Sequence, residues 1–330
     1  MKRIFSLILA LLLIILPLAS CTEETAEAGY FTRTKRDGAG RFSVSLWKSD
    51  KDGNPIPENE LEKIFDEAYS VFGKAYDFLS SDAKSKLSAI NAEVETVLDV
   101  DKKLIGEIKY ASELSEKCDG LYEPFGGALT SLLKKNPSPE KKEIAEAISH
   151  MGKDKLLISK TTVEKLDKKA MIDLGALCDG YALQAACDYL DDCISAYGTV
   201  TFNGIAGVFG KKPEGEAFSV EIGNGEDGIF NITDGYVALV SKDFGKSFDY
   251  KDGVIDTDVQ HIAVYASDAR VAAVIASIGY ANGADAVTSL YKKDDLTFEA
   301  VILKKDGKEV YTEKARTEEL YTPITTAEEK

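Results

Sequence analysis

Apolar residues recur along this chain at two spacings, and each spacing predicts a different kind of element. Between Glu58 and Ser80 they fall three and four residues apart, which is typical of a helix with one buried face. The same spacing predicts further helices over Asp101–Glu116, Pro139–Met151, Arg270–Ile278 and Ala284–Tyr291. Alternating or short apolar runs predict strands over Arg41–Lys48, Leu156–Ile158, Met171–Leu174, Thr199–Phe202, Phe218–Ile222, Gly228–Ile232, Gly235–Val240, His261–Ala266 and Phe298–Leu303.

The order of these elements indicates the fold class. Helices dominate the first part of the chain and strands the middle, which predicts an α+β fold. The length leaves open one large domain or two lobes around a shared core. The acidic residues after position 312 predict a flexible tail over residues 313–330.

The N-terminus has the layout of an export signal. Lys2 and Arg3 precede an apolar run, Ile4–Leu18, that is short for a membrane span, and Leu18-Ala19-Ser20-Cys21 matches a lipoprotein cleavage box. We therefore expect a signal peptide over residues 1–20, lipidation of Cys21, and an anchor and tether over residues 21–40. This predicts a protein held by lipid on the extracytoplasmic face of the cell membrane. An uncleaved anchor helix is the alternative.

The net charge and the numbers of histidines and cysteines limit the kinds of site that this chain can form. The formal net charge is −16 and no basic stripe is visible, which argues against a nucleic-acid partner. With only two histidines, a zinc site or a histidine-based triad has little to draw on. Disulfides and buried free thiols both stay open for Cys118, Cys178, Cys187 and Cys193.

The segment Met171–Leu190 carries the strongest chemical signal. An apolar run leads through Asp173–Gly175 into a helix of small residues. A helix N-terminus presents unsatisfied N–H groups and partial positive charge, so such a junction can hold a phosphate or another anion. Glycines there can also serve turn geometry alone, which leaves a purely structural interpretation open.

Several segments together resemble the bacterial FAD:protein FMN transferases, which split FAD and attach FMN to a hydroxyl of another protein. Met171–Leu190 resembles the family's Asp-Leu-Gly-Gly-x-x-Lys-Gly-Tyr-Ala motif, and Ser88–Asn91 its Ser-x-x-Asn motif. Gly120–Pro124 is similar to the Gly-x-Phe-Asp-x block, and Phe202–Ile205 stands where the family has Gly-Gly-Asp. The resemblance runs from about Phe42 to Gly307. It implies one domain over residues 41–312, with helices packed on mixed or antiparallel sheets around a central cleft.

The resemblance also implies roles for individual residues. The implied cofactor-binding residues are Asn91, Leu121, Tyr122, Glu123, Asp179, Asn203 and Gly204. The implied metal positions are Ala182 through its backbone, Ala273, and Ser277 through its hydroxyl, and the implied catalytic residue is Asp256. Ala284–Ser289 is a second candidate for the family's metal motif, although it lies closer to the strand Phe298–Leu303 than the family's spacing implies. FAD would be the substrate and Mg²⁺ the metal, because a divalent cation stabilises the charge that develops on a phosphate under attack.

Charged positions depart from the family pattern. Asp179 replaces a lysine, Gln184 an acidic residue, and Ala273 a metal-binding carboxylate, while Asp256 is the recognisable remnant of the His-x-x-Asp-Pro-x-Thr-Gly block. Two roles are open for Asp179, because it could supply negative charge to the pocket or simply cap a helix. The aromatic ring of Tyr122 could stack on flavin or fill the core.

The expected function is Mg²⁺-dependent covalent transfer of FMN from FAD to a Ser or Thr hydroxyl of an exported acceptor protein. One alternative is a member that keeps the fold and binds flavin without transferring it. Another is a lipid-anchored binding protein for a different small solute.

Overall fold

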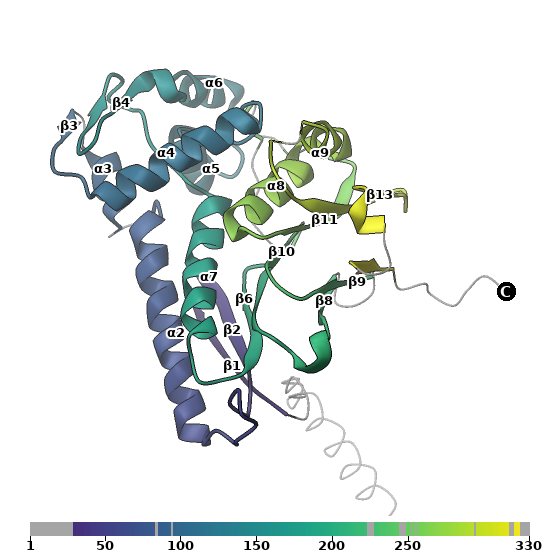
Figure 1. Ribbon diagram of the computed structural model, residues 1–330. Helices are drawn as coiled ribbons and strands as arrows, with labels where there is room; N and C mark the ends of the chain where they lie inside the picture. Colours follow the sequence, from purple (N-terminus) through teal and green to yellow (C-terminus); the bar gives the residue numbers. More distant parts are fainter. Residues whose placement is uncertain are drawn as a thin grey trace, which may run out of the picture.

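An antiparallel sheet of eight strands forms the centre of the fold in this computed structural model (Figure 1). The structure describes residues 29–82, 85–93, 95–222, 228–243, 249–251, 253, 255, 257–293, 295–316 and 320–323. In spatial order the strands are β1 (Tyr30–Asp37), β2 (Gly40–Trp47), β6 (Tyr197–Phe202), β7 (Ile205–Gly210), β10 (Tyr236–Ser241), β11 (Val259–Ala266), β12 (Glu299–Lys304) and β13 (Glu309–Tyr311). Short hairpins join β1 to β2, β6 to β7 and β12 to β13, and the other neighbouring strands of the sheet are joined by longer connections.

Three helices cover one face of this sheet, and the main core lies between them and the strands. They are α2 (Glu58–Leu79), α7 (Ala176–Asp191) and α8 (Ala269–Asn282) (Figure 1). Helices α7 and α8 approach closely at Gly180, where an added Cβ would lie 2.5 Å from the carbonyl oxygen of Ala269. A glycine is required there because no other residue leaves room for the neighbouring backbone.

A smaller sheet covers the opposite face of the central sheet. Its strands, in spatial order, are β14 (Tyr321–Thr322), β9 (Gly228–Ile232) and β8 (Phe218–Ile222). A second apolar cluster, which includes Val208, Phe230 and Val301, fills the space between the two sheets. The two β layers and the helical layer make an α+β fold, as the order of the elements predicts.

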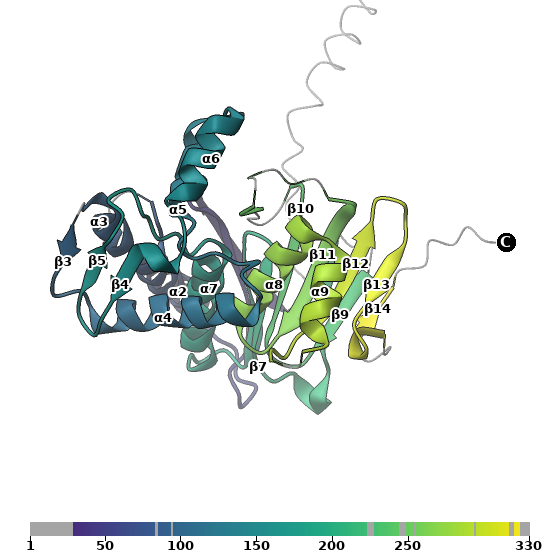
Figure 2. The ribbon, with the colours of Figure 1, turned by 90° about the horizontal axis from the view of Figure 1, so that it is seen from above.

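The remaining helices form a helical cap at the end of the molecule where α2 stops and α7 starts (Figure 2). They are α3 (Lys86–Ala92), α4 (Lys102–Lys117), α5 (Gly127–Lys135) and α6 (Lys141–Ser149), together with a sheet of β3 (Thr96–Val97), β5 (Val163–Lys165) and β4 (Leu156–Ile158). Helix α9 (Ala284–Tyr291) follows α8, and short 3₁₀ turns occur at Lys153–Lys155, Pro213–Gly215 and Lys314–Arg316. The helical cap brings residues from the first half of the chain to the start of α7.

Most of the predicted helices and strands are present, with one correction near the strongest motif. Met171–Leu174 is extended but pairs with no strand, so the strand predicted there is wrong. Side chains hold this segment instead of a β ladder: both amide atoms of Asn91 bond the backbone of Ile172. A short apolar run cannot reveal which groups will satisfy its backbone.

The folded domain extends beyond the predicted limits of residues 41–312 at both ends. Strand β1 pairs with β2 along its whole length, so the segment predicted as tether contributes an edge strand from Tyr30. At the other end, Tyr321 and Thr322 pair with β9 inside the predicted flexible tail. The signal peptide of residues 1–20 and Cys21 lie outside the described residues.

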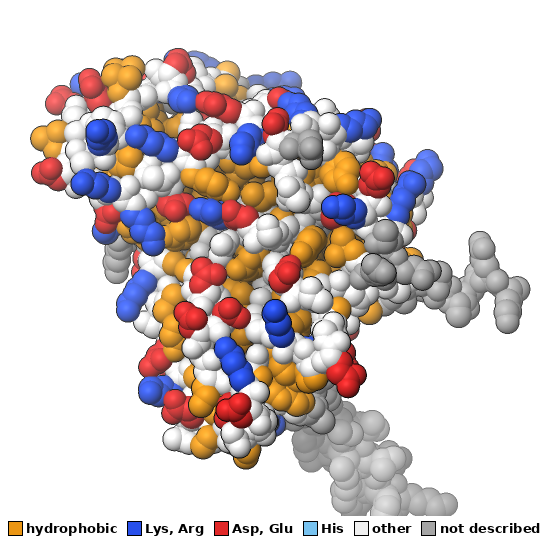
Figure 3. All heavy atoms as spheres, viewed as in Figure 1, with side chains coloured by type: hydrophobic (Ala, Val, Ile, Leu, Met, Phe, Trp, Pro, Cys, Tyr) orange, Lys and Arg blue, Asp and Glu red, His pale blue; other side chains and the backbone are white. Residues whose placement is uncertain are grey.

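Three further features concern the surface charge, the cysteines and the apolar character of the helices. Acidic and basic side chains are interspersed on the face shown in Figure 3. Cys118, Cys178, Cys187 and Cys193 are free thiols, so no disulfide joins these four described cysteines. Across the described residues, no helix combines the length and apolar character that crossing a bilayer requires.

Candidate functional site

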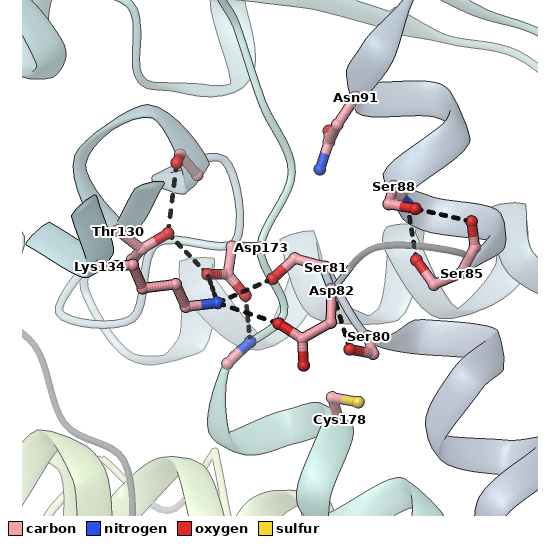
Figure 4. Close-up of polar contacts among 12 residues, drawn as sticks. Ser80, Ser81, Asp82, Ser85, Ser88, Asn91, Thr130, Lys134, Asp173 and Cys178 are labelled. Carbon is pink, nitrogen blue, oxygen red and sulfur yellow. Dashed lines mark hydrogen bonds and ion pairs between the residues drawn. The ribbon is translucent and has the colours of Figure 1, made fainter. Parts of the chain in front are cut away.

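A buried carboxylate marks the start of α7. Asp173 is 6% exposed, and its Oδ2 accepts a hydrogen bond of 2.6 Å from the hydroxyl of Thr130 on α5 (Figure 4). Its Oδ1 accepts from the backbone N–H of Gly175 at 3.1 Å. Gly175, at φ 52°, is the residue from which α7 starts. The carboxylate therefore links α5 to the first turn of α7.

Two predicted cofactor-binding residues hold the backbone just before α7. Asn91 on α3 donates to the carbonyl of Ile172 at 2.7 Å and accepts from its N–H at 2.8 Å. The hydroxyl of Tyr122, which is buried, donates to the carbonyl of Leu174 at 3.0 Å. Both side chains use these polar atoms on the protein backbone. In this structure the two side chains therefore position residues Ile172 and Leu174, which lead into α7.

A lysine from α5 supplies positive charge at this end of the site. The ammonium of Lys134 lies 3.9 Å from Asp173 Oδ2, 3.6 Å from Asp82 Oδ1 and 3.3 Å from the hydroxyl of Ser81 (Figure 4). Ser81 and Asp82 follow the C-terminus of α2. The side chain of Lys134 is 51% exposed, so it reaches the carboxylates from the solvent side.

A groove of about 720 Å³ runs from this polar cluster along α2. Ser80, Asp82 and Ser85 line it at the cluster end, and the turn between β1 and β2 lines it at the other end. The wall between them is formed by Tyr69, Phe72, Gly73 and Tyr76 of α2. Phe72 and Tyr76 are buried and pack on Phe202, and the ammonium of Lys35 lies 4.1 Å from the ring centroid of the half-buried Tyr69.

Asn203 and Gly204 form the turn between β6 and β7. Both have positive φ, 44° and 86°, which is typical of an Asn-Gly hairpin. The side chain of Asn203 donates to the carbonyl of Ala39 at 3.0 Å and so holds the turn that lines the groove. These predicted cofactor-binding residues thus lie behind the groove's end.

Asp179 lies inside α7 and is 2% exposed. It does not cap the helix, because α7 begins at Ala176 and Gly175 occupies the cap position. The alternative role of Asp179 as a helix cap is therefore wrong. The side chain of Asp179 is therefore buried inside the protein, at the position where the family motif has a lysine.

The predicted metal positions lie on α7 and α8. Ala182 is fully buried in α7 and Ala273 is 2% exposed in α8. The resemblance gives Ala182 a role through its backbone, and the methyl side chain of Ala273 cannot bind a cation, which leaves the partly buried hydroxyl of Ser277 as the side-chain oxygen of the set. Mg²⁺ prefers six oxygen ligands that include carboxylates, and the side chains of these three residues supply no carboxylate. Within the described ranges, no three or more His, Cys, Asp or Glu side chains come together as a metal site.

The loop before α5 carries the remaining predicted cofactor residues. Leu121 packs against the main core, and the carboxylate of Glu123 accepts a hydrogen bond of 2.9 Å from the N–H of Phe125. Burial raises the pKa of Glu123 above its ordinary value. Burial and the nearby Tyr250 and Asp173 hold the pKa of Tyr122 well above 10, so its hydroxyl stays a donor. The predicted catalytic residue, Asp256, lies outside the described residues.

Tyr250 lies beside Gly126 at the start of α5 and close to Gly175 at the start of α7. An added Cβ on Gly126 would lie 2.7 Å from its ring, and one on Gly175 would lie 3.7 Å from its hydroxyl. Burial, Asp173 and Glu123 raise its pKa above the ordinary value. The ring is therefore packed beside the first turn of α7.

A larger hollow, of about 1330 Å³, lies near the other end of α7. Its lining includes Asp188 and Asp191 of α7, Asp192 directly after the helix, and residues of β7 and the loop after β7. None of the predicted site residues lines this hollow, and none lines the smaller groove. The smaller groove is the better candidate because its lining residue Ala39 accepts a hydrogen bond from Asn203 and its lining residue Asp82 lies beside Lys134.

Sequence reasoning missed the groups that give the site its charge. Lys134 stands beside Lys135 at the end of a short helix, which looks like an exposed helix end. Asp82 and Thr130 belong to no motif. Only the fold brings them to Asp173, so no signal along the chain could have identified them.

Comparisons with known proteins identify a matching family and structures of similar fold. The family model described as "ApbE family" matches residues 41–264. A search of curated protein sequences gave no match. Among solved structures, the flavinyl transferase ApbE of Pseudomonas stutzeri is 18% identical with a TM-score of 0.71, over 86% of this chain and 95% of that one.

Two further structures resemble the chain to a similar degree. The flavin transferase ApbE of Vibrio cholerae is 16% identical with a TM-score of 0.70, over 86% of this chain and 97% of that one. The ApbE protein of Thermotoga maritima is 20% identical with a TM-score of 0.71, over the same shares. These likenesses show a shared fold. Because the family model also matches more than half of the sequence, including every segment that meets at the start of α7, the chain belongs to the ApbE family.

Proposed function

We propose that this protein transfers FMN from FAD to a hydroxyl of an exported acceptor protein. The observation that carries the proposal is the meeting of three family-like segments at the start of α7. Asn91 and Tyr122 both bond the backbone that leads into this helix, and a groove opens beside it. The named relatives of similar fold are flavin transferases, which supports the same reaction class.

Two features near the groove support a flavin nucleotide as its ligand. Tyr69 is the half-buried aromatic side chain of the α2 wall, against which a planar ring system can pack. Asp82 lines the polar end, and 3.6 Å from its Oδ1 lies the ammonium of Lys134, a group that can interact with negatively charged phosphates.

The proposed reaction breaks one bond and forms one. The acceptor hydroxyl oxygen attacks the phosphorus of the FMN half, the pyrophosphate bond breaks, and AMP leaves with the bridging oxygen. The hydroxyl proton passes to solvent or to a base. Stabilising the charge on the phosphate under attack is the main demand on the protein.

The location and partner belong to the same proposal. The export signal and Cys21, both outside the described residues, would place the enzyme on the extracytoplasmic face through a lipid anchor. An exported acceptor would meet it there. Magnesium dependence remains a prediction from the resemblance, and the side chains at Ala182, Ala273 and Ser277 do not support a metal at that position.

A second function is favoured by one observation. Asp179 is buried where the resembling family has a lysine, and the α8 carboxylate is replaced by Ala273. Loss of both charges is what a protein that binds flavin without transferring it would show. Under this alternative, FAD binds in the groove but is not cleaved.

The test uses the signal-free protein, FAD and a membrane extract from source cells that lack the gene. Transfer predicts a second protein that becomes flavin-fluorescent on a denaturing gel, together with AMP release. FAD binding with neither product would support the non-transferring alternative. Absence of any flavin binding would contradict both.

Matched glycine variants place the ligand in the groove. An added Cβ would meet open space at both Gly73 in α2 and Gly106 in α4, but only Gly73 lines the groove. We expect Gly73→Leu to fill the groove and abolish flavin binding, while Gly106→Leu leaves it unchanged. Equal binding by the two variants would show that flavin binds elsewhere.

A further inference from the structure

We propose that the β1–β2 hairpin docks the protein on an anionic lipid surface through the basic side chains of Lys35, Arg36 and Arg41. The inference rests on the membrane location in the proposed function and does not depend on the transfer reaction. It starts from a contrast in charge: the whole chain carries −16, whereas residues 30–41 hold four basic residues and one acidic residue. An anionic surface would attract this hairpin and repel the molecule as a whole, which favours one orientation.

The hairpin lies at an open border of the fold. Strand β1 is an edge strand of the eight-stranded sheet and pairs with β2 along its whole length (Figure 1). Arg36 and Arg41 are directly opposite each other in this pairing, and both are exposed. Like charges opposite each other weaken a β ladder, and an anion that meets both side chains would remove this repulsion.

The side of the hairpin that faces the helices uses part of its charge within the protein. The guanidinium of Arg33 lies 2.7 Å from Glu62 Oε1 on α2, so these two charges offset each other. The ammonium of Lys35 lies 4.1 Å from the ring centroid of Tyr69, but Lys35 stays exposed. The surplus of positive charge therefore lies around the turn of the hairpin.

The other side chains of the hairpin fit lipid headgroups rather than the acyl interior of a membrane. Hydroxyl groups on its outer face form two cross-strand pairs, Thr32 with Ser45 and Thr34 with Ser43, each at 2.9 Å. The exposed large apolar side chains of the described residues all lie outside the hairpin: Leu98, Leu157, Leu166, Ile194 and Ile255. Charged and hydroxyl groups without an apolar wedge predict contact at the headgroup level and no insertion.

The length of chain before the hairpin permits this contact. Eight residues, 22–29, separate Cys21 from Tyr30, and they can span at most about 30 Å. The strand places Arg36 about 20 Å from Tyr30. A lipid on Cys21 would therefore keep the basic turn within reach of the headgroups.

A second copy of the chain is a poorer occupant of this edge. Pairing β1 with β1 of another copy would bring basic side chains against one another, and charged edge strands discourage such pairing. An anionic lipid surface instead supplies the opposite charge.

The experiment measures vesicle binding by the signal-free protein without any lipid attached. Energy transfer from Trp47, the single tryptophan of the chain, to a dansyl-labelled lipid reports binding. We expect binding to phosphatidylglycerol vesicles to be about tenfold or more tighter than to phosphatidylcholine vesicles at low salt, because each basic group near an anionic surface adds attraction. Rising salt should remove the difference, because salt screens exposed charges.

Charge-removing variants locate the contact. Arg36→Gln combined with Arg41→Gln should lose most of the preference for phosphatidylglycerol. The matched control, Lys141→Gln combined with Lys142→Gln, removes two exposed charges from the start of α6 and should bind within a few-fold of the parent. Melting temperatures show whether each variant is folded. Lys35→Gln alone should weaken the preference by a smaller factor, which keeps the test decisive if the double variant does not fold.

The outcomes separate this inference from the proposed function. Equal binding of the parent to both kinds of vesicle would overturn the inference and leave the basic residues as protection of the sheet edge. A preference that is lost in the α6 control and kept in the hairpin variants would overturn it as well. Neither result bears on FMN transfer. Conversely, a protein that transfers no FMN, or that carries no lipid in cells, would contradict the proposed function and leave the vesicle result unchanged.

Discussion

Single polar side chains, rather than a β ladder, hold the backbone that leads into α7. Asn91 makes two hydrogen bonds to Ile172, and the ammonium of Lys165 in turn donates to the carbonyl of Asn91 at 2.8 Å. Burial lowers the pKa of Lys165. The approach to α7 therefore depends on hydrogen bonds made by residues of α3 and β5.

Replacing Asn91 tests this arrangement. We expect Asn91→Ala to destabilise the fold by about 1–3 kcal/mol, because both bonds to Ile172 are lost and buried backbone groups are left without them. Urea unfolding measures the change. Asn59→Ala, at an exposed position in the first turn of α2, should cost about 0.5 kcal/mol or less. Equal effects of the two substitutions would contradict the role of Asn91.

Glu123 predicts a pH dependence. Its pKa is raised in the folded state by burial, so the folded protein holds this proton more tightly than the unfolded chain does. The contribution of Glu123 to stability is therefore largest at low pH and falls as pH rises above about 4.5, until the raised pKa is passed. The unfolding free energy of the parent relative to Glu123→Gln should decline over this range. If the difference in unfolding free energy rose with pH instead, the pKa of Glu123 would be lowered in the folded state and this prediction would be wrong.

At the scale of elements, the contact between α7 and α8 fixes how the start of α7 meets the sheet. Gly180 permits this contact, and the side chain of Gln184 accepts a hydrogen bond of 3.1 Å from the N–H of Ala269 at the start of α8. Asp268 caps α8 through the N–H of Arg270 at 2.8 Å. The two helices are therefore packed together as one unit.

Alanine at Gly180 should disturb this unit. The new Cβ would lie 2.5 Å from a backbone oxygen, so α7 and α8 must separate, at an expected cost of roughly 1–3 kcal/mol. Gly106→Ala in α4 meets open space and should instead stabilise by about 1 kcal/mol, because alanine favours a helix. Thermal unfolding of both variants checks this. A Gly180→Ala protein as stable as the parent would show that the helices lie farther apart.

The periodic elements were predictable because their spacing alone decides them. The apolar stripe of α2 predicts Glu58–Ser80, and the helix spans Glu58–Leu79. The run at Met171–Leu174 misled because its partners are Asn91 and Tyr122, far away in the chain. The Asn-Gly pair at Asn203 is a hairpin signal that the local sequence carries, and it forms the turn between β6 and β7.

At the scale of the whole molecule, the four cysteines show how the fold sets reactivity. Burial raises the pKa of Cys118 to about 12 and that of Cys187 to about 12, so almost no thiolate forms at neutral pH. Cys193 is only partly buried. The fold therefore shields the thiols of Cys118 and Cys187 from reaction.

Labelling with a thiol reagent such as DTNB checks this shielding. In the folded protein we expect Cys118, Cys178 and Cys187 to stay unreacted while Cys193 reacts slowly. In denaturant without reductant all four should react, because none is held in a disulfide. Failure to label a pair of them in denaturant would reveal a disulfide.

The sequence by itself determined the fold class, the periodic helices and strands, and the family, since these depend on local spacing and on motifs that lie within short stretches. Only the tertiary structure decided the charge of the site. Lys134, Asp82 and Asp173 come from three separate segments, and their juxtaposition follows from how α5 and the end of α2 pack around the start of α7. Electrostatic interactions depend on distance in space, which the order of residues along the chain does not reveal.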